Sequence, residues 1–297
     1  MKYYSTNKQA PLASLEEAVV KGLASDKGLF MPMTIKPLPQ EFYDEIENLS
    51  FREIAYRVAD AFFGEDVPAE TLKEIVYDTL NFDVPLVPVK ENIYSLELFH
   101  GPTLAFKDVG GRFMARLLGY FIRKEGRKQV NVLVATSGDT GSAVANGFLG
   151  VEGIHVYVLY PKGKVSEIQE KQFTTLGRNI TALEVDGTFD DCQALVKAAF
   201  MDHELNERLL LTTTIHAHHC STYLRASIHM PMMLSAVVNE SSQGTLLSVN
   251  RISIQAMPKK AARNTSNRGR YLFKGVCVMG SSARVSFSLP RIQTIQP

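Results

Sequence analysis

The stretch VNVLVATSGDTGSAVANGF, residues 130–148, decides the fold of this chain. Its first six residues form a largely apolar run, which is typical of a strand buried on both faces of a parallel sheet. A loop with two glycines follows at 136–141, and a helical segment runs from about residue 142 to 148. This order of strand, loop and helix predicts one step of an α/β fold.

The same alternation extends from this stretch in both directions. Upstream, residues 108–124 carry apolar side chains at helical spacing, and a short strand is predicted at 94–99. Downstream, strands and helices continue to alternate, and we expect them at 154–160, 166–176, 180–185 and 189–201. Strands that alternate with helices at this spacing predict a parallel, doubly wound sheet with helices on both faces.

A lysine stands among small and apolar residues in HGPTLAFKD, residues 100–108. We expect Lys107 in the turn after strand 94–99. This position suits a functional lysine, because open α/β sheets bind ligands beyond the carboxyl ends of their strands. The residues before it, Leu104 to Phe106, are expected to desolvate its amine and so lower its pKa, which favours the neutral form that attacks a carbonyl. The alternative is a lysine at a helix start whose amine lies in water.

The loop TSGDTG at 136–141 has the residues of an anion site. Gly138 and Gly141 allow tight backbone geometry, and the start of the following helix is predicted to present unpaired N–H groups. Ser137 and Thr140 add hydroxyl donors. The alternative is an ordinary strand-to-helix turn capped by a polar side chain, for which the candidates are Asp139 and Ser142.

Together the two segments resemble the signature of the threonine synthases, a family of pyridoxal-phosphate enzymes of fold type II. Further segments carry the resemblance as far as residue 211: YYST at 3–6, SLEEAVVKGLASDKGLFMP at 14–32, LELF at 96–99, KDVGGRFMAR at 107–116, LYPKGKVS at 159–166 and VDGTFDDCQALV at 185–196. A threonine or serine dehydratase of the same fold is the alternative within this class. The N-terminal segments weaken that alternative, as does Asp139, where those relatives usually carry Asn.

The resemblance implies a lyase of threonine biosynthesis with pyridoxal 5'-phosphate as cofactor and O-phospho-L-homoserine as small-molecule substrate. Lys107 would form the Schiff base with the cofactor and then move protons at the substrate's Cα and Cβ, so that phosphate leaves Cγ and water adds at Cβ. The implied cofactor-binding residues are Lys107, Ser137, Gly138, Asp139, Thr140 and Gly141. The implied substrate-binding residues are Thr103, Ser137, Thr140 and Lys164. For Lys164, an exposed surface lysine is the competing interpretation.

The N-terminal region predicts a small, mainly helical domain over residues 1–90. A helix is expected at 14–24 with Ser14 as N-cap and Glu17 as capping-box partner, and its apolar face would include Leu23. A loop with three prolines follows at 25–39. Two further helices and an extended connector punctuated by prolines are then expected, at 50–63, 68–80 and around Pro85 and Pro88. We therefore divide the chain into an N-terminal domain (1–90), a partial catalytic core (91–211) and a tail (212–297).

The tail departs from the family pattern in composition and sequence. Residues 212–297 hold ten Lys/Arg and one acid, Glu240, whereas residues 1–211 hold 22 Lys/Arg and 30 Asp/Glu. The resemblance implies a later loop that grips the cofactor phosphate and a hydroxyl near the pyridine nitrogen, and neither is recognisable here. We expect a C-terminal part that is incomplete or disordered, weak cofactor affinity and little or no activity. A reading-frame change near the codon for Thr213 would explain the break.

Two functional interpretations of the tail are considered and set aside. His216, His218, His219 and Cys220 have the chemistry of metal ligands, but no second cluster matches them, so no metal is predicted. The basic charge suits nucleic acid, yet no binding motif accompanies it, so no nucleic-acid partner is predicted. A non-catalytic remnant of the family, or a basic interaction protein on the same scaffold, is the alternative from a different class.

The overall composition is that of an ordinary globular protein, with 45% hydrophobic residues and a formal net charge of +1. Three widely spaced cysteines without a CxxC motif suggest a reducing compartment. No apolar stretch approaches 18 residues, and the N-terminus lacks the apolar segment of a signal peptide. These features predict a cytoplasmic protein without a membrane partner, and they set no oligomeric state.

Overall fold

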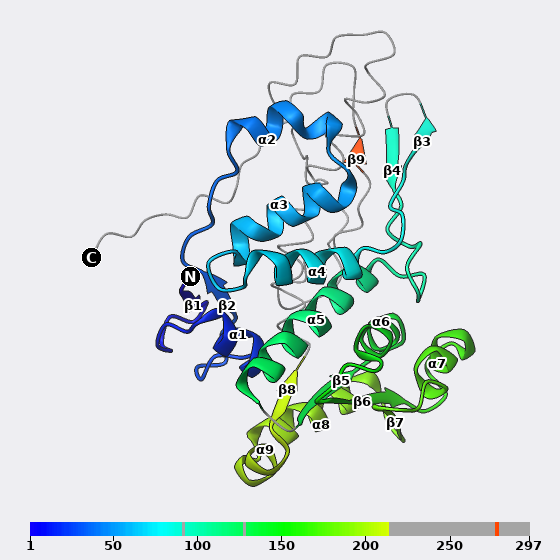
Figure 1. Ribbon diagram of the computed structural model, residues 1–297. Coiled ribbons are helices and arrows are strands. Elements are labelled where there is room, and N and C mark those ends of the chain that lie inside the picture. Colours follow the sequence, from blue (N-terminus) through cyan, green and yellow to red (C-terminus); the bar gives the residue numbers. More distant parts are fainter. Residues whose placement is uncertain (91–92, 127–128, 214–276, 279–297) are drawn as a thin grey trace, which may run out of the picture. The chain divides into compact units, whose positions relative to one another are not determined.

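The computed structural model describes residues 1–90, 93–126, 129–213 and 277–278 (Figure 1). Within them, residues 1–84 and 98–213 belong to one compact unit. Residues 85–97 and 277–278 belong to a second unit. The two units are described separately. None of the helices in the described part of the chain is long and apolar enough to cross a membrane.

A four-stranded parallel sheet lies at the centre of the first unit. Its strands are β5 (Val130–Ala135), β6 (Ile154–Pro161), β7 (Ile180–Val185) and β8 (Leu211–Thr213), in the order β7-β6-β5-β8. The register pairs Val130 with Ile154 and Val156 with Ile180. The three predicted strands and the parallel sheet are confirmed. Strand β8 was not expected, because three residues are too few to show a periodic pattern.

Helices cover both faces of this sheet, as predicted. Helix α8 (Phe189–Met201) packs Cys192 and Val196 against alternate residues of β5 and β6, among them Leu133 and Leu159. The intervening valines of the two strands are at most 2% exposed and face the other side, where helix α6 (Asp139–Phe148) packs on β5 and β6 (Figure 1). This two-sided burial explains why β5 is a nearly continuous apolar run.

The remaining helices of the core have the bounds α5 (Lys107–Glu125), α7 (Glu167–Thr174) and α9 (His203–Leu209). Helix α5 packs along α6, and α7 packs on α6 from a different direction (Figure 1). The predicted helices at 108–124, 166–176 and 189–201 are confirmed within one or two residues at each end. Helix α9 was not expected, and it begins where Asp202 accepts a hydrogen bond from the N–H of Leu205.

The N-terminal region contains a two-stranded antiparallel sheet and four α-helices. Its elements are β1 (Tyr3–Ser5), α1 (Leu15–Lys21), β2 (Phe30–Pro32), α2 (Gln40–Glu45), the 3₁₀ turn η1 (Ile46–Asn48), α3 (Phe51–Phe63) and α4 (Ala69–Thr79). The predicted helices at 50–63 and 68–80 are confirmed. The predicted loop 25–39 contains strand β2, which pairs with β1. This strand was not expected, because its partner β1 lies more than twenty residues away in the sequence.

The first predicted helix is shorter than expected. Ser14 caps α1 by accepting from the N–H of Glu17, as predicted, but the helix ends at Lys21 because Gly22 has a φ of 70°. The Glu17 carboxylate accepts from the Lys21 ammonium at 2.6 Å. The capping box predicted at this site occurs instead at α3, where Ser50 and Glu53 bond reciprocally.

Asp26 organises the loop beside β1. Its carboxylate accepts from the Ser5 hydroxyl at 2.5 Å and from three backbone N–H groups at 2.9 Å, those of Gln9, Ala10 and Gly28. These donors, the Ser5 hydroxyl first among them, lower the pKa of Asp26 to about 2. One ionised side chain therefore ties the loop after β1 to the segment before β2.

The second unit corrects one prediction. Strands β3 (Leu86–Lys90), β4 (Ile93–Leu96) and β9 (Cys277–Val278) form an antiparallel sheet in the order β3-β4-β9. The predicted strand 94–99 is thus β4, and it does not belong to the parallel sheet. The connector around Pro85 and Pro88 is itself strand β3 in part. Strands joined by two residues pair antiparallel, since a parallel pair needs a long crossover.

Candidate functional site

Close contact between α5 and α6 brings the starts of both helices together. A Cβ on Gly147 would lie 2.8 Å from the Gly111 carbonyl carbon, so only glycines allow this approach. Arg116 of α5 donates to the Gly147 carbonyl oxygen at 3.2 Å. One turn earlier, Arg112 donates to the Thr79 and Asp78 carbonyl oxygens at the end of α4. Burial lowers the pKa of the Arg112 guanidinium. Helix α5 is therefore held on two sides.

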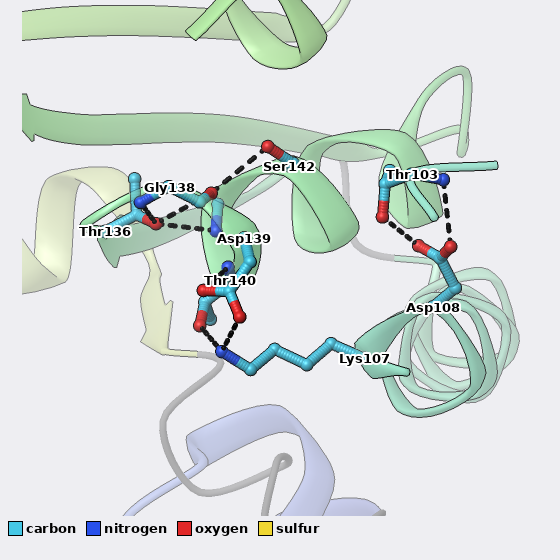
Figure 2. A network of polar contacts seen from close by, with 9 residues as sticks. Thr103, Lys107, Asp108, Thr136, Gly138, Asp139, Thr140 and Ser142 are labelled. Carbon is cyan, nitrogen blue, oxygen red and sulfur yellow. Dashed lines mark hydrogen bonds and ion pairs between the residues drawn. The ribbon is translucent and has the colours of Figure 1, made fainter. Parts of the chain in front are cut away.

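Lys107 is the first residue of α5, and its side chain reaches the start of α6 (Figure 2). Its Nζ lies 2.8 Å from Asp139 Oδ2 and 2.5 Å from Thr140 Oγ1. The Lys107 side chain is 17% exposed, and that of Asp139 is 41% exposed. The structure thus brings together three of the predicted site residues, from segments more than thirty positions apart in the sequence.

The surroundings of Lys107 correct two predictions. Lys107 does not follow a strand of the parallel sheet: the strand before it belongs to the antiparallel sheet, and ten residues separate the two. Leu104 and Phe106 do not bury the amine either, since they are 72% and 42% exposed. A positive φ of 56° at Leu104 turns the chain so that its side chain faces solvent. The partners of the amine come from α6 instead; the Phe106 ring centroid lies 5.7 Å away.

The loop after β5 is organised by Thr136, which is not among the predicted site residues. Its hydroxyl oxygen is buried and accepts from the N–H of Gly138 at 3.0 Å and from that of Gly141 at 2.8 Å (Figure 2). Gly138 precedes α6 with a φ of 138°, a conformation that favours glycine. A threonine directly before a glycine-rich turn is the signal that could have indicated this role.

These contacts correct the prediction of unpaired N–H groups at the start of α6. Thr136 satisfies two of them, and Asp139 Oδ1 accepts from the N–H of Thr140 at 2.9 Å. The helix also begins at Asp139, three residues earlier than predicted, so that Asp139 and Thr140 lie in its first turn. The alternative of a cap by Asp139 or Ser142 is not what is observed, because the N-cap position is occupied by Gly138, which makes no side-chain cap hydrogen bond. Asp139 lies inside the first turn, and the Ser142 hydroxyl donates to the Gly138 carbonyl oxygen.

Residues 82–230, half of the chain, match the sequence family described as "Pyridoxal-phosphate dependent enzyme". The chain belongs to this family. Residues 2–80 match a second family, "Threonine synthase N terminus". Curated relatives include the threonine synthase of Escherichia coli, 45% identical over 213 residues, and that of Saccharomyces cerevisiae, 43% identical over 226 residues. The matches cover 72% and 69% of this chain and 49% and 44% of those proteins.

Solved structures show the same relationship. A pyridoxal-phosphate-bound threonine synthase from Brucella melitensis has a TM-score of 0.70 at 35% identity, covering 82% of this chain and 52% of that one. The Escherichia coli enzyme has a TM-score of 0.68 at 39% identity, covering 85% and 56%. The chain therefore has the fold of the pyridoxal-phosphate dependent threonine synthases, and it spans about half the length of the curated relatives it matches. The dehydratase alternative is not favoured.

Three other predicted site residues, Thr103, Ser137 and Lys164, are not hydrogen-bonded to the Lys107 amine. Ser137 is exposed at the end of β5. Thr103 is buried, and its hydroxyl donates to Asp108. Lys164 is exposed, and its Nζ donates to the Gly187 carbonyl oxygen at 3.0 Å. Their contacts with cofactor or substrate stay predictions.

The metal prediction concerns residues that the structure does not describe. His216, His218, His219 and Cys220 lie outside the described residues, as do all ten Lys/Arg of the tail. Within the described part of the chain, no group of three His, Cys, Asp or Glu side chains is arranged to hold a metal ion.

Proposed function

We propose that this chain carries the lysine site of a threonine synthase. The reaction is the pyridoxal-phosphate dependent conversion of O-phospho-L-homoserine and water to L-threonine and phosphate, a lyase step of threonine biosynthesis. One observation carries the proposal: the Lys107 amine, at the start of α5, is held by Asp139 and Thr140 at the start of α6. Its support is that these segments lie within residues 82–230, which match the pyridoxal-phosphate dependent family, and that the chain is 40–46% identical to threonine synthases.

The residues around Lys107 fit the aldehyde end of pyridoxal phosphate. An amine that binds an aldehyde must be reachable yet held in one place. The Lys107 side chain is 17% exposed, and two oxygen atoms fix its end. Lys107 would hold the cofactor, with Ser137, Asp139 and Thr140 beside it and Gly138 and Gly141 shaping the backbone. When bound, the cofactor supplies an electron sink for charge that develops at the substrate's Cα.

The chain's own groups would then handle protons and orientation. Lys107 Nζ would take protons from the substrate's Cα and Cβ, so that phosphate can leave Cγ, and would return protons at Cγ and Cα, while water supplies the hydroxyl at Cβ. An amine at that place is a positioned general base and acid. The Asp139 carboxylate and the Thr140 hydroxyl would orient the amine between these positions. Thr140 and Ser137 would face the substrate, and Lys164 would attract its phosphate. The Thr103 hydroxyl donates to Asp108, so we give it no substrate contact in this proposal.

The sequence of the tail limits the activity that we expect. No loop for the cofactor phosphate is recognisable in residues 212–297. We therefore expect covalent capture of pyridoxal phosphate at Lys107 with little turnover. The same proposal includes a catalytic region at 91–211 after an N-terminal domain at 1–90, and a cytoplasmic location.

Covalent capture tests the proposal. The purified chain is mixed with pyridoxal phosphate, reduced with borohydride, digested and mapped by mass spectrometry. We expect one modified lysine, Lys107, and loss of that adduct in Lys107→Ala. The matched control is Lys124→Ala, which removes an exposed lysine from the other end of α5 and retains the adduct. Label distributed over surface lysines and unchanged in Lys107→Ala would refute the proposal.

Phosphate release from O-phospho-L-homoserine separates an enzyme from a remnant. Release that depends on both pyridoxal phosphate and Lys107 would establish turnover. Capture at Lys107 without any phosphate release would identify a non-catalytic, cofactor-binding remnant.

A further inference from the structure

A buried carboxylate lies directly after Lys107, and the proposed chemistry does not use it. Asp108 is 1% exposed. Its Oδ1 accepts from the Thr103 hydroxyl at 2.5 Å, and its Oδ2 accepts from the Thr103 N–H at 2.9 Å (Figure 2). Burying a carboxylate is unfavourable unless donors compensate it. The nearby Arg112 guanidinium donates to carbonyl oxygens of α4 and not to Asp108. The two hydrogen bonds from Thr103 are therefore those that compensate the buried Asp108 carboxylate.

The chain between Thr103 and Asp108 is shaped around this carboxylate. A Cβ on Gly101 would lie 2.5 Å from Asp108 Oδ2, so the carboxylate occupies the space that a side chain would need. The N–H of Leu104 donates to the Gly101 carbonyl oxygen at 3.0 Å and closes a turn. From α7, the Gln172 side-chain amide donates to the Thr103 carbonyl oxygen at 3.3 Å. The turn is thereby attached both to α5 and to α7.

The backbone of Lys107 lies next to Asp108, which is hydrogen-bonded to Thr103, and its side chain ends at Asp139 and Thr140 of α6. The first turn of a helix frays easily, since its N–H groups have no partners within the helix. Here Asp108 ties that turn to Thr103, so the backbone of Lys107 has a fixed direction. Its amine then reaches Asp139 and Thr140 at hydrogen-bond distance.

We infer that Thr103 and Asp108 are positioning residues that aim the Lys107 amine at the start of α6. The inference rests on the proposed function, in which Lys107 holds the cofactor. Neither residue touches the reacting atoms in this arrangement; both act through Lys107. Loss of the Thr103–Asp108 bond therefore releases the amine from Asp139 and Thr140 before it affects the rest of the fold.

The test measures the amine itself, without cofactor. The full chain is treated with formaldehyde and cyanoborohydride, and the rate of methylation at Lys107 is followed by peptide mass spectrometry. Thr103→Val removes the hydroxyl and keeps the shape. Because a hydrogen bond to a charged group is worth a factor of about ten, we expect about tenfold faster methylation of Lys107 in this variant. Thr103→Ser restores the hydroxyl and is expected to restore the slow rate.

A matched control exists at another helix start. The Thr188 hydroxyl donates to Asp191 Oδ2 at 2.7 Å at the beginning of α8. Thr188→Val removes the same kind of bond and is expected to leave the Lys107 rate unchanged, whatever its effect on thermal stability. Asp108→Asn, which keeps the side-chain shape, provides a second test and is expected to raise the rate in the same direction.

The outcomes separate this inference from the proposed function. An unchanged Lys107 rate in both Thr103→Val and Asp108→Asn overturns the inference, even if pyridoxal phosphate is captured at Lys107. A faster rate in these variants, unaffected in Thr188→Val, supports it, even if the wild-type chain captures no pyridoxal phosphate and the proposed function fails. If Thr188→Val accelerates methylation of Lys107 as much as Thr103→Val does, the effect comes from a general loosening of the fold, and the inference is also overturned.

Discussion

Replacing Gly147 by alanine tests the contact that brings the two halves of the site together. The new Cβ would lie 2.8 Å from the Gly111 carbonyl carbon and 2.9 Å from its oxygen, whereas ordinary contacts begin at 3.4 Å. The helices must separate by about 0.6 Å or more, because the opposing atoms belong to backbone and cannot rotate away. The strain acts one turn beyond Lys107 on α5.

The magnitude follows from two opposing effects. Overpacking of a well-filled contact costs about 1–3 kcal/mol, and a rigid backbone partner places this site at the upper end. Alanine gains about 1 kcal/mol over glycine in a helix interior. The expected net loss is about 2 kcal/mol, which lowers the thermal midpoint by about 4–8 °C for a unit of this size. Thermal unfolding followed by circular dichroism measures this change.

Gly119→Ala is the matched control in α5. Its Cβ would meet Val151 Cγ1 at 2.9 Å and Arg123 Nη1 at 3.3 Å, which are the ends of side chains that can move. We expect its midpoint to stay close to that of the wild type, since the helix preference of alanine offsets a small adjustment. If Gly147→Ala unfolds at the same temperature as Gly119→Ala or above it, the backbone contact between α5 and α6 is not tight and the reasoning is refuted.

Two further predictions concern polar side chains. The pKa of Asp26 falls from its ordinary 3.8 to about 2, so its stabilising effect is complete above the ordinary value and lost as the pH falls from 3.8 to about 2. The gap between the thermal midpoints of wild type and Asp26→Asn is therefore expected to be constant near pH 6 and to shrink below pH 3.8; a gap that does not change with pH contradicts this. Thr136→Val leaves the N–H groups of Gly138 and Gly141 without their acceptor, and we expect it to cost about 2–3 kcal/mol in urea unfolding. Thr174→Val, at an exposed position, is expected to cost less than about 0.5 kcal/mol, and an equal loss in both variants argues against the role of Thr136.

Much of the core fold could be predicted from local pattern. Strands β5 and β6 are recognisable because burial on both faces requires apolar runs, and the helices between the strands show apolar faces. Strand β7 lies at the edge of the sheet with only Ile180 buried, and it was predicted from its place in the alternation of strands and helices. The exceptions are elements whose partners are distant. Strand β2 exists because β1 pairs with it, and the strand at 93–96 was assigned to the wrong sheet because its partner, β3, was read as a connector. The partner with which a strand pairs cannot be recognised from the periodicity of the strand's own residues.

The candidate site was predicted in part. Lys107, Asp139 and Thr140 were selected from the residue types and from the resemblance, and they lie together. Thr136 and Asp108 were missed, because their roles depend on turns whose backbone angles the sequence pattern does not show. The φ of 56° at Leu104 is the decisive example: it turns an apolar residue outward and lets Thr103 reach back to Asp108.

By itself the sequence determined the alternation of strands and helices, the parallel sheet, the resemblance to threonine synthases and the lysine of the proposed chemistry. These properties are local, since each follows from the order and spacing of residues within one segment. Only the tertiary structure decided what holds the Lys107 amine. Glycines in α5 and α6 let two backbones touch, and this contact joins a lysine to a hydroxyl 33 positions away. Such a meeting depends on how closely two helices pack, a property that neither segment carries alone.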